Sequence, residues 1–217
     1  MSARLYYLKG DFRVPRIVSM LALAEIDCEF ISITDHDLDT LSELQRLSPL
    51  GLTPIFKHNE STVLFKVPSI LRYLARLHKE KGLAGLLPKE EALVDQWVDL
   101  CCEQLDPLIQ RSIEELGAGY PNSSRAEAYL REIAKILSVL EARFSQDYRF
   151  FVGYGPTLAD VALASTLTVG FWQIFKDYFS LGFPHTTRWL KDCKQRFDFA
   201  SVKCNSPRFL PNWRERE

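Results

Sequence analysis

The first eighty residues alternate between short apolar runs and segments with helical periodicity. Residues 4–8 and 28–33 predict strands, and "TPIFKHNESTVLF" predicts two further strands around a polar turn. Apolar residues recur at helical spacing over 14–26, 38–47 and 68–77. The predicted order is therefore βαβαββα, which is typical of a compact sheet covered by helices.

Strand patterning stops after residue 80. "KEKGLAGLLPKE" carries two glycines and a proline and indicates a surface linker. Apolar spacing then predicts a long helix over 93–108, which we expect Pro107 to bend or end, and another over 126–144. Two more helices are expected at "PTLADVALASTLTV" and "FPHTTRWLKDCKQRF". The sequence predicts an α/β domain over 1–80, a linker over 81–89 and an α-helical domain over 90–217.

Composition narrows the class of protein. The 217 residues have a formal net charge of −1, so no strong field attracts nucleic acid or an anionic membrane. No apolar run is long enough to span a bilayer, and the first residues lack a signal-peptide pattern. The five cysteines show no CxxC and the four histidines are scattered, so we expect reduced thiols, no metal site and a cytoplasmic location.

Thr157 and Asp160 have the spacing of a helix capping box, with aspartate in place of the usual glutamate or glutamine. The hydroxyl can accept from the N–H three residues on, and the carboxylate can reach back to the N–H of Thr157. Losing such a cap costs about 1 kcal/mol. We interpret this pair as structural.

The stretch "LFKVPSI" lies where an apolar strand gives way to a helix, a place that often holds an anion. Its residues do not suit that task. Lys66 and Val67 stand where a carboxylate and a hydroxyl would be expected, and Pro68 removes a backbone N–H. The sequence leaves open whether a ligand site was lost here or never existed.

The order of these parts resembles a cytosolic glutathione S-transferase: a βαβαββα unit, an X-Pro turn at Thr53-Pro54, a linker, and helices with a Thr-x-x-Asp box. The resemblance covers nearly the whole chain and implies a thioredoxin-like N-terminal domain followed by an α-helical domain. It is strongest over "SPLGLTPIF", "LFKVPSILRYL" and "FVGYGPTLADVALASTLTVGFWQIF". Together with "VPR" at 14–16 and "QWV" at 96–98, these stretches look like the transferase-like domain of the gamma subunit of translation elongation factor 1.

The resemblance also predicts which ligand the corner formed by "LFKVPSI" would bind. In transferases an acidic residue or glutamine and then a serine bind the γ-glutamyl part of glutathione, and Lys66 and Val67 occupy those two positions. The preceding turn, Thr53-Pro54, is implied to pair with the cysteinyl part through a cis proline. Each lost hydrogen bond to a charged group costs about 1.5–3 kcal/mol, so two losses weaken binding by roughly 10²–10⁴-fold. We expect a degenerate glutathione site formed by Thr53, Pro54, Lys66 and Val67, and no bound cofactor.

Catalysis in the family also needs a hydroxyl or thiol just after the first strand, beside the glutathione sulfur. The turn over 9–13, "KGDFR", offers none, and its aspartate disfavours a thiolate. Tyr6 and Tyr7 lie within the strand pattern, where we expect them to pack. No catalytic residue is therefore assigned.

Three functions follow from the resemblance. The first is a non-catalytic interaction domain of the elongation factor 1 complex that scaffolds guanine-nucleotide-exchange subunits during translation elongation. The second is an active transferase that uses glutathione or an altered anionic thiol, with Lys66, Arg13 or Arg16 supplying charge. The third is an adaptor domain of an aminoacyl-tRNA synthetase complex. The fold also implies a homodimer.

Overall fold

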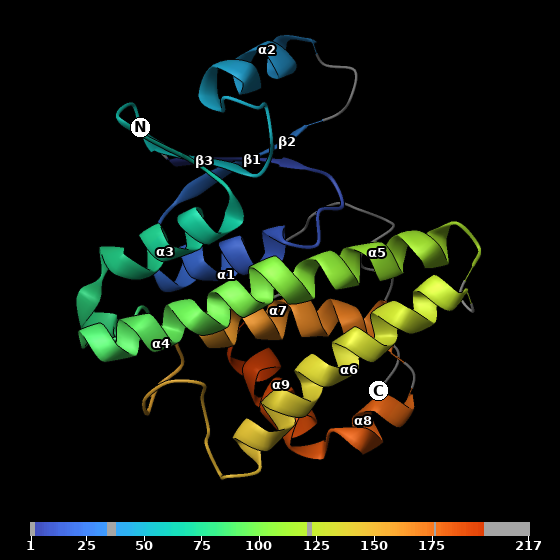
Figure 1. The fold of residues 1–217 in the computed structure, drawn as a ribbon. Coiled ribbons are helices and arrows are strands. Elements are labelled where there is room, and N and C mark those ends of the chain that lie inside the picture. Colours follow the sequence, from blue (N-terminus) through green and yellow to red (C-terminus); the bar gives the residue numbers. More distant parts are fainter. Residues whose placement is uncertain (1–2, 34–37, 121–122, 176, 198–217) are drawn as a thin grey trace. The chain divides into compact units, whose positions relative to one another are not determined.

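A computed structural model describes residues 3–33, 38–120, 123–175 and 177–197. By their contacts these residues divide into two compact units, one up to His78 and one from Lys79 to Phe197, and each is described by itself. The first unit contains four strands and three helices, and the rest of the described chain is helical (Figure 1). The elements of the first unit are β1 (Ala3–Leu8), α1 (Val14–Leu23), β2 (Cys28–Ile33), α2 (Leu38–Leu47), β3 (Ile55–Asn59), β4 (Thr62–Phe65) and α3 (Val67–Leu77).

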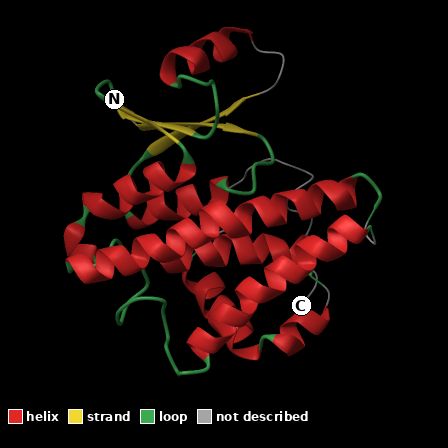
Figure 2. Ribbon diagram, viewed as in Figure 1, coloured by secondary structure: helices red, strands yellow, loops and turns green. Residues whose placement is uncertain are grey.

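The sheet of the first unit has the strand order β2-β1-β3-β4. β1 and β2 are parallel, and β3 runs antiparallel to both β1 and β4. Helices α1 and α3 cover one face of the sheet and α2 covers the other (Figure 2). On the α2 side a small core joins Tyr6, Ile33, Leu44 and Ile55. The predicted βαβαββα order is confirmed.

The second unit is built around α7, which is buried without a break from Leu158 to Leu167. α7 packs against α4, α5 and α9, and α6 packs against α5 and α9. Such an evenly apolar helix is expected at the centre of a bundle rather than at its surface. The elements of the second unit are η1 (Lys79–Lys81), α4 (Pro88–Asp99), η2 (Leu100–Leu105), α5 (Asp106–Gly117), α6 (Ser124–Phe144), α7 (Leu158–Gln173), α8 (Asp177–Gly182) and α9 (Pro184–Arg196).

Two boundaries differ from the expectation. α4 begins at Pro88, inside the predicted linker over 81–89, because proline suits the first turn of a helix. Pro107 does not end the long helix, which continues as α5 to Gly117. The irregularity lies just before it, where η2 is a π-helical turn and the N–H of Asp106 donates to the carbonyl of Cys101. Since proline cannot donate to the helical ladder, a local change of hydrogen bonding before it is physically reasonable.

No helix in the described ranges is both long and apolar enough to cross a membrane.

Candidate functional site

The corner between β4 and α3 is formed by Lys66, which is the N-cap residue of α3. Its backbone has φ 73° and ψ 123°, in the region that favours glycine. The carbonyl of Lys66 accepts the N–H of Ile70 at 3.2 Å, while the Lys66 side chain is exposed. Such a conformation in a non-glycine residue costs about 1–3 kcal/mol and persists only where the surroundings impose it. The surrounding structure therefore fixes the backbone of Lys66, while its side chain remains exposed.

The corner combines an apolar side chain with a cationic one. Val67 is 4% exposed, so an apolar side chain fills the position where the resemblance to transferases predicts a serine hydroxyl. Pro68, in the first turn of α3, removes one of the N–H groups that could face an anion. The ammonium of Lys66 adds positive charge at the positive end of the helix dipole. The corner can attract an anion in a general way, but the side chains of Lys66, Val67 and Pro68 offer no acceptor for an amine.

The X-Pro turn lies at the same end of the sheet as the corner. The Thr53–Pro54 peptide bond is cis, as predicted. Ile55, which follows it, is paired with Phe65, the residue that precedes Lys66. Pro54 is buried and Thr53 is half-buried. The structure thus brings together Thr53, Pro54, Lys66 and Val67, the four residues that the sequence assigned to a degenerate site.

The turn after β1 also lies at this end, because Tyr6 of β1 is paired with Ile55. In this turn the guanidinium of Arg13 binds the carboxylate of Asp11 through two bonds, Nε to Oδ1 at 2.8 Å and a terminal nitrogen to Oδ2 at 2.7 Å. The Arg13 N–H also donates to Oδ1 at 3.0 Å. The Asp11 side chain is only 7% exposed. This bidentate ion pair offsets the negative charge of Asp11, which the sequence analysis expected to disfavour a thiolate near this turn. The only sequence signal for the pair is that Asp11 and Arg13 are oppositely charged and lie two positions apart just before a helix.

The other polar groups considered near this end are buried. Tyr6 is fully buried and Tyr7 is 7% exposed, in agreement with a packing role in β1. Arg16, on α1, is fully buried, which the sequence pattern gave no reason to expect. Both tyrosines are thus largely covered by the surrounding protein.

The described cysteines include two with clear reasons to stay protonated. Burial, with a smaller effect of Glu29, raises the pKa of the Cys28 thiol to about 12. Burial also raises the pKa of Cys193, assisted by Asp160 and Asp192. A nucleophilic thiol needs a lowered pKa, so neither cysteine suits thiol chemistry.

Thr157 and Asp160 form the expected capping box at the start of α7. One carboxylate oxygen of Asp160 accepts from the N–H of Thr157 at 2.9 Å and from its hydroxyl at 3.0 Å. The other accepts from the Phe151 N–H and from Trp189 Nε1, both at 3.1 Å. Burial raises the pKa of Asp160 to about 6, although these hydrogen bonds favour the charged form. The box therefore joins α7, α9 and the loop before α7, which is a structural task.

Comparison with known proteins agrees with this architecture. Residues 97–196 match the model of the glutathione S-transferase C-terminal domain. Among solved structures, the glutathione transferase URE2P6 from Phanerochaete chrysosporium, in complex with oxidized glutathione, superposes with a TM-score of 0.82 at 21% identity, over 96% of this chain and 98% of that one. The chain has a glutathione S-transferase-like fold. Poplar glutathione transferase F1 has the same fold, with a TM-score of 0.77 at 23% identity over 93% of this chain and 96% of the poplar chain.

Curated relatives of this glutathione S-transferase-like chain include elongation factor 1-gamma of Homo sapiens, which is 29% identical over 161 residues and 74% of this chain. Elongation factor 1-gamma 3 of Oryza sativa subsp. japonica is also 29% identical over 74% of this chain. The matched region spans 36% of the human protein and 38% of the rice protein, so the chain matches about a third of the length of these relatives. The predicted resemblance to the transferase fold and to elongation factor 1-gamma is confirmed.

Proposed function

We propose that the chain is a non-catalytic protein-interaction domain of the elongation factor 1-gamma type. In this role it scaffolds guanine-nucleotide-exchange subunits of the elongation factor 1 complex in the cytoplasm, as a homodimer and without bound glutathione. The sequence similarity to elongation factor 1-gamma supports the partner class. The single observation that supports the absence of catalysis is the β4–α3 corner, where an exposed lysine and a buried valine stand at the two positions that the resemblance assigns to glutathione binding.

A transferase that uses a different anionic thiol is the alternative that this geometry disfavours. It requires cationic side chains in addition to Lys66 to hold the anion. Arg13 is engaged by both carboxylate oxygens of Asp11, and Arg16 is fully buried. Arg16 is therefore not placed to present an exposed guanidinium to a ligand, and the guanidinium of Arg13, whose side chain is 40% exposed, is already paired with Asp11.

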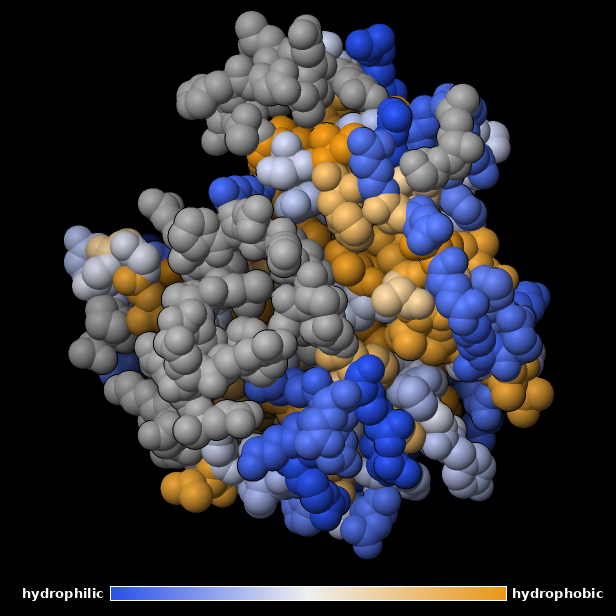
Figure 3. All heavy atoms as spheres, turned by 180° about the vertical axis from the view of Figure 1, so that it is seen from behind, coloured by the Kyte–Doolittle hydropathy of each residue, from blue (hydrophilic) through white to orange (hydrophobic). Residues whose placement is uncertain are grey.

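An adaptor domain of an aminoacyl-tRNA synthetase complex shares the non-catalytic prediction and differs only in its partner. Apolar side chains that reach the surface, such as Leu50 at 72% exposed and Leu181 at 82% exposed, are compatible with either kind of protein partner. Apolar residues also reach the surface between hydrophilic ones in the view of Figure 3. The partner must therefore be identified directly.

The test combines an activity assay with an interaction assay on the full 217-residue chain. We expect no conjugation of glutathione to 1-chloro-2,4-dinitrobenzene above the uncatalysed rate, and no heat of glutathione binding in calorimetry. We also expect purified exchange subunits of elongation factor 1 to co-elute with the chain in size-exclusion chromatography. Turnover at ordinary transferase rates would overturn the absence of catalysis. Co-elution with aminoacyl-tRNA synthetases, but not with exchange subunits, would replace the partner.

A further inference from the structure

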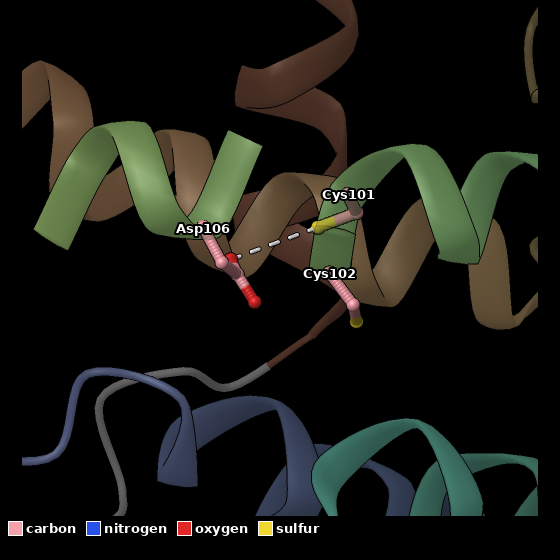
Figure 4. A group of neighbouring side chains, drawn as sticks. All are labelled: Cys101, Cys102 and Asp106. Carbon is pink, nitrogen blue, oxygen red and sulfur yellow. Dashed lines mark hydrogen bonds between the residues drawn. The ribbon is translucent and has the colours of Figure 1, made fainter. Parts of the chain in front are cut away.

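Three metal-binding side chains meet at the π-helical turn between α4 and α5. The Sγ atoms of Cys101 and Cys102 and a carboxylate oxygen of Asp106 all lie within 4.8 Å of one another. In Figure 4 the Cys101 side chain points toward Asp106, and Cys102 projects from the same turn. Cysteine thiolates and carboxylate oxygens are both common ligands of zinc in proteins.

The π-helical turn explains why these three residues meet. Residues five positions apart lie about 140° from one another around an ordinary α-helix, so Cys101 and Asp106 would face different sides. Here the Asp106 N–H donates to the carbonyl of Cys101, five residues back, which widens the turn and brings the two side chains together. The Cys101 Sγ to Asp106 Oδ1 distance is 3.9 Å. The sequence shows only two adjacent cysteines, because the widened turn leaves no mark in residue spacing.

Helix α7 adds a fourth donor to this group. The hydroxyl of Thr166 lies 2.8 Å from Asp106 Oδ1 and 3.3 Å from Cys101 Sγ. Cys101 and Thr166 are fully buried and Asp106 is 6% exposed, while Cys102 is half-buried. The four donors therefore come from the continuous α4–η2–α5 segment and from α7, which pack together in the same unit.

We propose that Cys101, Cys102 and Asp106 bind one thiophilic divalent cation, with zinc as the physiological candidate and the Thr166 hydroxyl or a water in the fourth position. Ligand atoms about 2.0–2.3 Å from a tetrahedral zinc lie roughly 3.3–3.8 Å apart. The 3.9 Å distance between Cys101 and Asp106 already approaches this value, and the widest distance, 4.8 Å, must contract by about 1 Å. Binding converts two thiols to thiolates and releases two protons to solvent. Such an ion would hold the α4–α5 junction against α7.

The experiment titrates the reduced, metal-free full chain with Zn²⁺, and with Co²⁺ as a spectroscopic probe. We expect one equivalent of Zn²⁺ to bind with a dissociation constant below about 1 μM, releasing two protons and raising the midpoint of thermal unfolding. The cobalt form should show thiolate-to-cobalt charge transfer and the intense d–d bands of tetrahedral coordination. These readouts need no variant, so they test the proposal even if a substitution prevents folding.

Variants assign the ligands. Cys102→Ser is half-buried and is expected to fold, and Asp106→Asn tests the carboxylate; each should weaken Zn²⁺ binding at least about tenfold. The matched control is Cys28→Ser, a half-buried cysteine of β2 in the other unit, which should leave the titration unchanged. Binding weaker than about 1 μM, or binding that Cys28→Ser abolishes and Cys102→Ser does not, would overturn the proposal.

Discussion

At the scale of single residues, Asp160 is a buried carboxylate that accepts four hydrogen bonds from Thr157, Phe151 and Trp189. Burial raises its pKa from the ordinary 3.8 to about 6. The folded state then binds a proton more tightly than the unfolded state does. The stability associated with this proton is fully present below about pH 4 and is lost as the pH rises through about 6.

We predict that Asp160→Asn removes this component of the pH dependence. Between pH 4 and 6.5 the free energy of unfolding of the wild type should fall by about 2 kcal/mol relative to that of the variant, since each pKa unit corresponds to about 1.36 kcal/mol. Urea unfolding at several pH values, followed by tryptophan fluorescence, measures the difference. Asp147→Asn, at an exposed aspartate in the loop after α6, is the control and should run parallel to the wild type. Parallel curves for Asp160→Asn would contradict the prediction.

At the scale of elements, α9 receives its N-terminal cap from another helix. Its own N-cap residue, Phe183, provides no side-chain hydrogen bond. Instead the carboxylate of Glu141 in α6 accepts from the His185 N–H at 2.9 Å, and from the Thr186 N–H and hydroxyl, both at 2.8 Å. Burial is the largest single influence on Glu141 and raises its pKa, but these hydrogen bonds together outweigh it and lower the pKa. The carboxylate thus joins α6 to α9 as an ion.

We predict that Glu141→Gln destabilises the helical unit by about 1–3 kcal/mol at pH 7, because one oxygen that accepts two donors becomes an NH₂ group. Since the folded-state pKa is lowered, the effect is present above the ordinary value of 4.5 and is lost as the pH falls through the lowered pKa. Urea denaturation at pH 7 and at pH 3.5 measures both parts. Glu132→Gln, on the same helix and in an exposed pair with Lys135, should change stability by less than about 1 kcal/mol. An equal effect of the two variants would mean that Glu141 does not cap α9.

The elements also show what the sequence could predict. The strands and helices could be predicted from hydrophobic periodicity, and the capping box from the spacing of Thr157 and Asp160. Both features depend on local sequence alone. The cap of α9 by Glu141 could not be predicted, since its donors lie more than forty residues away. The short helix α8 was missed because six residues carry too little periodicity. The π-helical turn before Pro107 was missed because residue spacing does not reveal which carbonyl an N–H selects.

At the scale of the whole molecule, the residues of the degenerate site were assigned through a resemblance that spans the chain. The residue types of Lys66 and Val67 alone do not indicate a glutathione site. They indicate one only because the two residues lie between a strand and a helix, opposite the cis proline. The conformation of Lys66 and the pairing of Asp11 with Arg13 were not predicted, because both are set by backbone geometry at the sheet end. The proposed loss of glutathione binding and catalysis therefore rests on two separate places, the corner and the turn after β1.

Substitutions at the corner alone should therefore change the affinity for glutathione without producing catalysis. Lys66→Glu with Val67→Ser restores an acceptor for the glutamyl amine and a hydroxyl for its carboxylate, so glutathione affinity should rise by roughly 10²-fold or more. Conjugation should remain at the uncatalysed rate, because the turn over residues 9–13 still offers no hydroxyl or thiol beside the sulfur. Isothermal calorimetry and the dinitrobenzene assay separate the two effects. Lys89→Glu with Val139→Ser makes the same changes at exposed positions of the helical unit and should leave both readouts unchanged. No gain in affinity would show that the corner does not correspond to the glutathione site, whereas turnover would show that the turn after β1 is not the missing part.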